Sequence, residues 1–328
     1  MRFLFFGIGS IGKRHIGNIA ELEPDAEFFA FRKRNLPLGE FGEKYRIKIF
    51  KDLKKVFHQK YDAAFITNPT SMHMPFALLA AKNNCNLFIE KPVSHNMVGI
   101  ERLKKTVENK KLITFVAYNM RFHPGIRKMK ETIKKLGKLY FARLQVGEYL
   151  PDWHPYEDYS QGYSARKDLG GGALLTMIHE IDYLLWLKGN PNRVYSMMAK
   201  VSNLKIGVED NVEVVLGYED GFIAEINMNY LLRKYSRTCQ IVGENAMLEW
   251  DYYKNSLKFF ENKEERTIWE NKSFKRNDMF LEEMKHFLDC IRKNKETDID
   301  LNEGLKSLKV VMAAKKANEY AKVMKCKM

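Results

Sequence analysis

The stretch RFLFFGIGSIGKRHIGNIAEL at residues 2–22 decides the fold of this 328-residue chain. An apolar run over residues 2–6 leads directly into Gly7, Gly9 and Gly12, and a helical pattern follows. This is the G-x-G-x-x-G motif in the strand–turn–helix context that a dinucleotide-binding unit requires. The sequence therefore predicts a nucleotide-binding unit at the start of the chain.

Each glycine of the motif has its own predicted role. Gly7 permits the tight turn, Gly9 lets the backbone approach a pyrophosphate, and Gly12 allows the helix to pack closely on the strand. Ser10 and Ile11 lie at the start of the helix, whose free N–H groups are suited to bind phosphate. The alternative is a glycine turn that binds no ligand.

The end of the second predicted strand, AEFFAF at residues 26–31, bears on the choice of cofactor. An acidic residue there would bind the ribose 2′-hydroxyl of NAD(H), whereas an arginine accommodates the 2′-phosphate of NADP(H). The chain continues with Arg32, Lys33 and Arg34 and has no carboxylate at this point. We therefore expect NADP(H) to be favoured, with NAD(H) possible. The alternative is a solvated basic loop.

Strand and helix patterns alternate along the first third of the chain. Strands are predicted at 62–68, 86–90 and 112–118, with helices at 71–84 and 97–109 between them. Such alternation predicts an α/β protein with a doubly wound parallel sheet, a Rossmann arrangement with helices on both faces. Ligands bind these sheets at the carboxyl ends of the strands.

Two further turns lie at these carboxyl ends and so face the same crevice as the glycine turn. The predicted cofactor-binding residues of these turns and the following helix are Thr67, Asn68, Pro69, His73, Glu90 and Lys91.

Lys91 is also a candidate catalytic residue. Pro92 restricts the backbone directly after it, so the lysine is held in place. Beside a bound nicotinamide, its ammonium group could hydrogen-bond a substrate hydroxyl and lower the barrier to deprotonation of that hydroxyl. The alternative is a surface lysine paired with Glu90.

Four segments together resemble one known family. They are the glycine motif, TNPTSMH at 67–73, EKPVS at 90–94 and GGGALLTMIHEID at 170–182, in this order and at suitable spacing. Over nearly its whole length the chain is similar to the Gfo/Idh/MocA oxidoreductases, which include glucose–fructose oxidoreductase and inositol dehydrogenase. The resemblance implies an N-terminal Rossmann domain, a C-terminal α/β domain with an open mixed sheet, and hydride transfer at a carbohydrate carbon.

The pattern changes near residue 121. Short extended runs separated by tight turns predict antiparallel hairpins, and hence an open, largely antiparallel sheet in the second domain. Two helices close the chain, at about 277–293 and 302–325. We expect a Rossmann domain over 1–120, a substrate-binding domain over 121–300, and a C-terminal helix over 301–328 that packs near the first domain.

Residues 169–189 are predicted to form one apolar helix after three glycines, with His179, Glu180 and Asp182 in its middle. His179 and Asp182 are three residues apart, so they share a helix face and can hydrogen-bond, which orients the imidazole. The resemblance implies that such a helix brings His179 to the substrate as an acid/base, with Lys91 as its partner. The alternative is a buried histidine satisfied by Asp182.

One position departs from the family pattern. Many members carry an aspartate four residues before the histidine, where this chain has Leu175, and the nearest polar residue is Thr176. Threonine cannot replace a carboxylate as a base. Three possibilities stay open: His179 and Lys91 suffice, Glu180 contributes, or the activity has changed. No metal is expected, because no further ligands accompany His179.

The long segment YLPDWHPYEDYSQGYSARKDLGGG at residues 149–172 is rich in aromatic residues. Aromatic faces pack on sugar rings, and Arg166 could bind a carboxylate or phosphate through two hydrogen bonds. Long loops are usually functional or disordered, and the aromatic content argues for function. The predicted substrate-binding residues are Trp153, His154, Tyr163, Arg166, Lys167 and Asp182. The segment also resembles members linked to nonulosonic acid and other surface-sugar pathways.

The formal charge of +14 is spread over the whole chain. Nucleic-acid binding requires a concentrated basic stripe or a known module, and neither is present. Some attraction for anionic ligands is the expected consequence. Scattered cysteines and the lack of an apolar run of membrane length favour a cytoplasmic protein without a membrane partner.

The residues, together with what the family resemblance implies, thus predict an NADP(H)- or NAD(H)-dependent oxidoreductase that acts on an anionic sugar or nucleotide sugar in surface-glycan biosynthesis. Two other functions stay open: a tightly bound nicotinamide used in an internal epimerisation or relay, and a non-catalytic protein that senses a dinucleotide. We also expect a homo-oligomer formed through the C-terminal sheet.

Overall fold

A computed structural model describes residues 1–33, 37–155 and 157–326 of the chain. The chain forms two compact units, of which the first comprises Met1–Tyr118 and Asn277–Leu305 and the second comprises Asn119–Arg276 and the chain from Lys306 onward. The sequence predicts boundaries at 120 and 300 instead. The difference lies in the two closing helices, since residues 277–305 are part of the first unit and the chain from Lys306 is part of the second.

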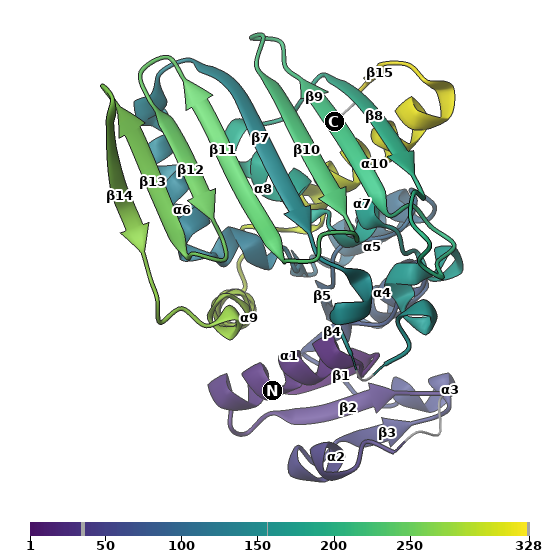
Figure 1. Cartoon of the computed structure of the whole chain (residues 1–328). Helices are drawn as coiled ribbons and strands as arrows, with labels where there is room; N and C mark the ends of the chain where they lie inside the picture. Colours follow the sequence, from purple (N-terminus) through teal and green to yellow (C-terminus); the bar gives the residue numbers. More distant parts are fainter. Residues whose placement is uncertain (34–36, 156, 327–328) are drawn as a thin grey trace. The chain divides into compact units, whose positions relative to one another are not determined.

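The first unit is built on a six-stranded parallel sheet in the order β3-β2-β1-β4-β5-β6 (Figure 1). Its strands are β1 (Arg2–Phe6), β2 (Glu27–Phe31), β3 (Lys48–Phe50), β4 (Ala63–Ile66), β5 (Asn86–Ile89) and β6 (Thr114–Val116). The predicted doubly wound parallel sheet is confirmed. β3 and the short helices α2 (Glu40–Lys44) and α3 (Leu53–Val56) were not predicted, because most of their residues are not buried and show no apolar period.

A row of phenylalanines crosses this sheet in register. Phe5 pairs with Phe65, Phe65 with Phe88, and Phe88 with Phe115, on four neighbouring strands. Adjacent ring centroids lie 4.6, 4.8 and 5.2 Å apart. The row is fully buried, and offset aromatic contacts of this kind contribute beyond the area they bury.

Helices cover both faces of the first sheet. On one face lie α1 (Ser10–Leu22) and α9 (Arg276–Lys293), whose Phe287 packs 5.3 Å from Phe88. On the other face lies α4 (His73–Lys82), whose Phe76 stacks 4.6 Å from Phe6. The helix α5 (Ile100–Lys110) packs against α4.

The second unit is built on a nine-stranded mixed sheet in the order β14-β13-β12-β11-β7-β10-β9-β8-β15 (Figure 1). Among the described residues of this sheet, the central strands β7 and β10 pair in parallel and the other neighbouring strands pair antiparallel. The strands are β7 (Leu139–Gly147), β8 (Arg193–Ala199), β9 (Asn211–Gly217), β10 (Ile223–Asn229), β11 (Ser236–Gly243), β12 (Met247–Asp251), β13 (Ser256–Glu261), β14 (Glu264–Glu270) and β15 (Met324–Lys325). The predicted open, largely antiparallel sheet is confirmed.

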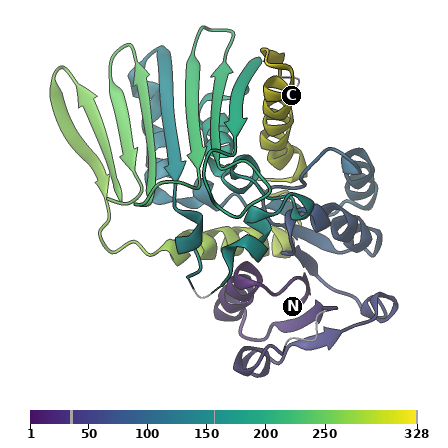
Figure 2. The same ribbon diagram turned by 45° about the vertical axis from the view of Figure 1, so that its right-hand side comes forward.

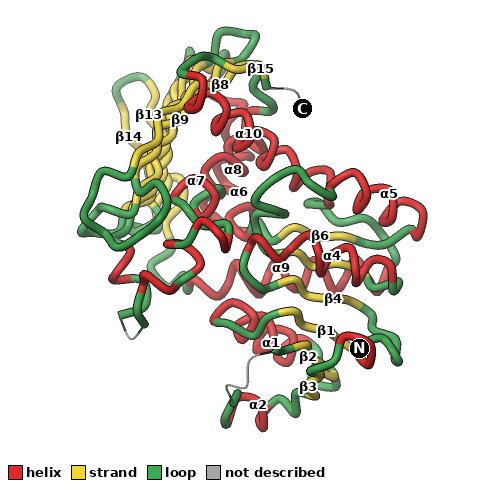
Figure 3. The backbone as a smooth tube through the Cα atoms, turned by 90° about the vertical axis from the view of Figure 1, so that its right-hand side faces the viewer, coloured by secondary structure: helices red, strands yellow, loops and turns green. Residues whose placement is uncertain are grey.

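Helices lie along one face of this sheet, as Figure 3 shows. They are α6 (Pro124–Thr132), α7 (Ala173–Thr176), α8 (His179–Lys188) and the main part of α10 (Leu301–Tyr320). Ser196 of β8 donates to the carbonyl of Ala314 in α10, which in Figure 2 runs beside the β8 end of the sheet. Among the described residues, no helix is long and apolar enough to cross a membrane.

The single helix predicted for residues 169–189 is wrong. The segment forms α7 and α8 with a break at Met177 and Ile178, so His179 is the first residue of α8 and does not lie in mid-helix. Different partners hold the two pieces. Glu209 accepts the N–H of Leu174 in α7, whereas α8 is held by buried ion pairs. Tertiary contacts override the continuous helical period.

His123 lies in the aromatic core of the second unit. Its Nδ1 accepts the N–H of Gly125 at the start of α6, and its ring lies within 5.4 Å of the rings of Trp250, Tyr252, Trp269 and Phe274. Burial, helped by the charge of Arg237, lowers the pKa of His123 from 6.5 to about 3. The histidine is therefore neutral in the folded protein over most of the acid range.

The free energy of unfolding should fall as the pH falls from about 6.5 to about 3. In this window the unfolded chain binds a proton at His123 that the folded chain does not, which costs at most about 1.4 kcal/mol per pH unit. The variant His123→Asn keeps a residue that caps helices but cannot titrate, so its unfolding should depend less steeply on pH. Urea unfolding at several pH values measures both slopes, and the exposed His58→Asn variant should keep the wild-type slope.

Candidate active site

Two glycines of the motif are surrounded by backbone. Gly7 has a φ of +109°, and a Cβ atom there would lie 2.7 Å from the backbone nitrogen of Asn68. A Cβ atom on Gly12 would lie 2.5 Å from the carbonyl oxygen of Gly7. No side chain fits at either position without a shift of the backbone.

Gly9 differs from both. A Cβ atom on Gly9 would meet no atom of the described residues within 4 Å. Gly9 is the N-cap of α1, no side chain in the described part of the chain caps this helix end, and its first turn carries no acidic residue. Ser10 is exposed and Ile11 is half-buried. The open space over Gly9 and the uncapped N–H groups beside it fit the pyrophosphate of a dinucleotide.

The turn after β4 is joined to the glycine turn. Thr67 donates its hydroxyl hydrogen to the carbonyl of Gly7 at 2.6 Å. The amide oxygen and nitrogen of Asn68 are both buried, and neither has a hydrogen-bond partner among the described residues. A buried amide without partners is costly, so Asn68 is suited to bind a polar group of the cofactor. The half-buried Pro69 continues this turn.

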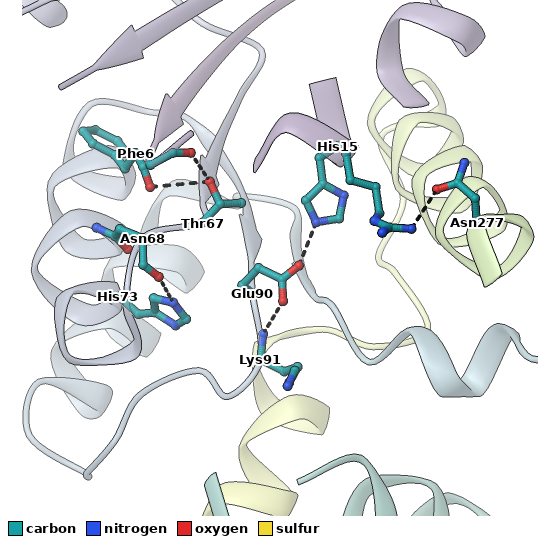
Figure 4. A network of polar contacts seen from close by, with 10 residues as sticks. Phe6, His15, Thr67, Asn68, His73, Glu90, Lys91 and Asn277 are labelled. Atoms are coloured by element: carbon teal, nitrogen blue, oxygen red, sulfur yellow. Dashed lines mark hydrogen bonds and ion pairs between the residues drawn. The ribbon is translucent and has the colours of Figure 1, made fainter. Parts of the chain in front are cut away.

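His73 joins two of the turns. Its Nε2 lies 2.8 Å from the carbonyl oxygen of Asn68 (Figure 4). Its Nδ1 lies 2.8 Å from the carbonyl oxygen of Pro92. Burial lowers the pKa of His73 below its usual value, although both carbonyl oxygens favour the protonated form. His73 thus acts as a link between the turns after β4 and β5.

Glu90 holds the turn that carries Lys91. Its carboxylate lies 2.7 Å from Nε2 of His15 in α1 and accepts the backbone N–H of Lys91 at 3.2 Å. The Lys91 side chain extends away from Glu90, as Figure 4 shows. His15 was not predicted, although its place three residues after Gly12 on the buried face of α1 was a signal.

The basic residues after β2 occupy the expected position. Arg32 directly follows the strand, and its N–H donates to the carbonyl of Phe50 at 3.0 Å. Arg32 is half-buried and Lys33 is exposed, whereas Arg34 lies outside the described residues.

In the second unit, Asp182 forms a buried ion pair that was not predicted. Its carboxylate accepts from Nε and Nη2 of Arg121 at 2.8 and 2.7 Å, and from the hydroxyl of Ser307 at 3.1 Å. Asp182 is fully buried, so the structure gives it an anchoring role in α8 in place of the predicted substrate contact. The hydrogen bond between His179 and Asp182 stays a prediction. His179 itself is 8% exposed.

Glu180 also has a buried partner. Its Oε1 lies 2.8 Å from Nε of Arg237, and the carboxylate is inaccessible to solvent. Leu175 and Thr176 are buried in α7. An ion-paired carboxylate in this position is better suited to hold α8 than to accept a substrate proton.

The predicted substrate loop is ordered into short turns. Trp153 is half-buried and packs edge to face on Tyr230 at 5.4 Å, and the Tyr230 hydroxyl donates to the carbonyl of Ser164. His154 and Tyr163 are exposed. The 3-10 turns of the loop are Leu150–Asp152, Tyr159–Gln161, Tyr163–Ala165 and Lys167–Leu169.

A recess of about 540 Å³ in the second unit gathers three cations. Its basic residues are Arg166, Lys167 and Lys205, and its one acid is Asp168. Asp168 pairs with Arg166 through bonds of 3.0 and 2.6 Å. Lys167 and Lys205 form no ion pair with any residue that the structure describes. The recess is therefore suited to an anionic group.

Comparisons with known proteins agree with this arrangement. Residues 1–118 match the oxidoreductase family with an NAD-binding Rossmann fold, and residues 126–249 match the Gfo/Idh/MocA C-terminal domain. Myo-inositol 2-dehydrogenase of Thermotoga maritima is 25% identical over 99% of this chain and 98% of its own length. The NADP(+)-dependent scyllo-inositol 2-dehydrogenase IolU of Bacillus subtilis is 24% identical over 76% of each chain.

Solved structures share the fold over the whole chain. Levoglucosan dehydrogenase in complex with NADH and levoglucosan has a TM-score of 0.89 at 16% identity, with 100% of both chains covered. The WlbA dehydrogenase of Bordetella pertussis in complex with NADH and UDP-GlcNAcA has a TM-score of 0.84 at 22% identity, with 100% of this chain and 99% of that chain covered.

Gly9→Ala should separate dinucleotide binding from folding. The backbone at Gly9 has a φ of −83°, which alanine adopts, and its Cβ would meet no atom of the described residues within 4 Å. We expect thermal stability close to wild type and a fall in NADPH affinity of at least about ten-fold, since the methyl group would fill the predicted pyrophosphate site. Fluorescence titration with NADPH measures the affinity.

Gly17→Ala in the same helix is the matched control, because its Cβ would make only an ordinary contact with Tyr45. It should bind NADPH as the wild type does. Wild-type affinity in Gly9→Ala would place the pyrophosphate elsewhere.

Proposed function

This chain belongs to the Gfo/Idh/MocA family of NAD(P)-dependent oxidoreductases, and on that basis we propose that it oxidises or reduces one carbon of an anionic sugar or nucleotide sugar. The observation that carries the proposal is the Lys91 turn, which Glu90 holds at the carboxyl edge of the dinucleotide-binding sheet. A bound nicotinamide would supply the hydride acceptor or donor.

In this proposal Lys91 and His179 handle the substrate hydroxyl. The Lys91 ammonium donates a hydrogen bond to the hydroxyl oxygen, which stabilises negative charge as the proton leaves. His179 accepts the proton during oxidation and returns it during reduction, as an imidazole can do. Glu180 and Asp182 take no direct part, since Arg237 and Arg121 hold their carboxylates.

The recess of Arg166, Lys167 and Lys205 supports an anionic substrate. Two of its ammonium groups lack an ion pair among the described residues, so a carboxylate or phosphate would improve the charge balance. The UDP-GlcNAcA bound by the WlbA dehydrogenase is a ligand of this class. The inositol named for the Thermotoga maritima relative is a neutral polyol and serves as the contrasting substrate. A place in surface-glycan biosynthesis stays a prediction.

NADP(H) is the proposed preferred cofactor. Arg32 and Lys33 provide two positive charges directly after β2, where a dinucleotide carries its adenosine ribose. The IolU relative is NADP(+)-dependent, whereas both structural neighbours described above bind NADH. The basic pair is the feature that favours NADP(H) in this chain.

The outer face of the nine-stranded sheet is the proposed surface for a homo-oligomer. Met197 of β8, Val215 of β9 and Ile223 of β10 are 65%, 37% and 49% exposed. They come from neighbouring strands and alternate with buried residues of the core face. An exposed group of large apolar side chains marks a surface that associates with a partner.

Lys91→Ala and His179→Ala should each lower kcat by about 10² to 10⁴, because each removes a group that acts on the hydroxyl. NADPH binding should stay close to wild type in His179→Ala. The assay follows the nicotinamide absorbance with UDP-GlcNAcA, myo-inositol and levoglucosan as substrates. Lys82→Ala, at an exposed position of α4, is the control. Wild-type turnover in either variant would remove that residue from the mechanism.

Arg32→Ala should reverse the cofactor preference. Loss of a charged hydrogen bond to the 2′-phosphate costs about 1.5–3 kcal/mol, so NADPH affinity should fall about ten- to hundred-fold while NADH affinity changes little. Parallel titrations with NADPH and NADH give both dissociation constants. Lys60→Ala, also at an exposed position of the first unit, should bind both as the wild type does. An NADH preference in the wild type would show that the basic pair is a solvated loop.

A further inference from the structure

The helix α9 carries a carboxyl group in the middle of its apolar face. Glu283 lies between Phe280 and Phe287 on the face that covers the first sheet, and it is fully buried. Neither of its carboxyl oxygens has a hydrogen-bond partner among the described residues. An unsatisfied buried polar group of this kind destabilises the fold, so a role is needed to explain the presence of Glu283.

Other unsatisfied polar atoms face the same region from α1. His15 is fully buried, and its Nδ1 has no hydrogen-bond partner in the described part of the chain. The ring of His15 lies 6.2 Å from the ring of Phe280, one turn before Glu283. Asn18 accepts from Asn277 of α9 at 2.9 Å, which fixes α1 beside α9.

The charge state of Glu283 suits it to pair with His15. Burial, followed by the nearby charge of Glu90, raises the pKa of Glu283 well above its usual value. Two neighbouring carboxyl groups in a buried region do not both ionise, so Glu283 is the protonated one and carries an O–H donor. His15 offers the complementary acceptor at Nδ1 when its Nε2 donates to Glu90.

We propose that Glu283 is a positioning residue for Lys91, acting through His15 and Glu90. The Glu283 hydroxyl donates to Nδ1 of His15 through one buried water, which fixes the tautomer that donates from Nε2. That donation holds the Glu90 carboxylate in the orientation in which it accepts the Lys91 N–H. The proposal rests on the catalytic role proposed for Lys91.

The competing explanation is that Glu283 only fills space in the core. In that case leucine should serve as well, since it has a similar volume and removes two unsatisfied polar atoms. The two explanations differ in what leucine does to the Lys91 turn, not in what it does to overall stability.

The test compares Glu283→Leu and Glu283→Gln with the control Met284→Leu, a buried neighbour on the same helix. Amide hydrogen exchange, read by mass spectrometry on peptides that contain residues 88–93, reports on the Lys91 N–H. We expect Glu283→Leu to unfold at the wild-type temperature or above, yet to exchange about ten-fold faster in this turn. Glu283→Gln keeps a donor and should stay close to wild type, as should Met284→Leu.

Wild-type exchange in Glu283→Leu would overturn the proposal and leave Glu283 as core filling. If the Glu283→Leu variant does not fold, Glu283→Met replaces it in the exchange experiment, because methionine adapts to irregular sites. The exchange measurement uses no substrate. It therefore tests whether Glu283 holds the Lys91 turn even if Lys91→Ala shows wild-type turnover and Lys91 is not catalytic. With a sugar that the wild-type protein turns over, Glu283→Leu should also lower kcat about ten-fold at an unchanged KM for NADPH.

Discussion

The in-register phenylalanine row of the first sheet is the constraint on which the rest of the site depends. Phe5, Phe65, Phe88 and Phe115 stack across four parallel strands and so fix the offset between those strands. A slip by one residue in any pair would turn a phenylalanine to the opposite face of the sheet. Because the offset is fixed, the strands end level with one another, and the turns that follow them meet at one edge.

Buried polar side chains then hold those turns together. His73 joins the carbonyls of Asn68 and Pro92, Thr67 binds the glycine turn, and His15 holds Glu90. In each case the holding group comes from a different element than the turn it fixes. The second unit uses the same principle with ion pairs, in which Arg121 and Arg237 hold two carboxylates of α8. Groups that must be placed within a fraction of an ångström gain from such support.

Much of the fold could be predicted because its signals are local. The glycine motif, the alternation of strands and helices, and the hairpins of the second unit are each contained in short windows of sequence. The break between α7 and α8 could not be predicted, because the apolar pattern continues through Met177 and Ile178. The break depends on contacts with Glu209 and Arg121, which are distant in the chain.

In the candidate site, too, features with a local sequence signal could be predicted, whereas contacts between residues distant in the chain could not. The turns that carry Asn68 and Lys91 follow from strand ends and glycine spacing. Asp182 was expected to contact the substrate, but it is buried and Arg121 binds its carboxylate, and no spacing rule connects residues 121 and 182. Glu283 was missed for a similar reason, because it directly follows Glu282 in α9 and an acid in a helix is easily taken for a solvent-facing residue.

The first unit is interrupted in sequence, and this affects how the protein is made. Residues 119–276 intervene between its sheet and α9, whose Phe287 packs on Phe88 of the phenylalanine row. A ribosome therefore releases the six strands long before it releases the helix that covers one of their faces. During that interval the face beneath α9 lacks part of its cover, which is the kind of transient exposure that chaperones bind. Synthesis of the second unit thus sets the delay before the dinucleotide-binding unit can be completed.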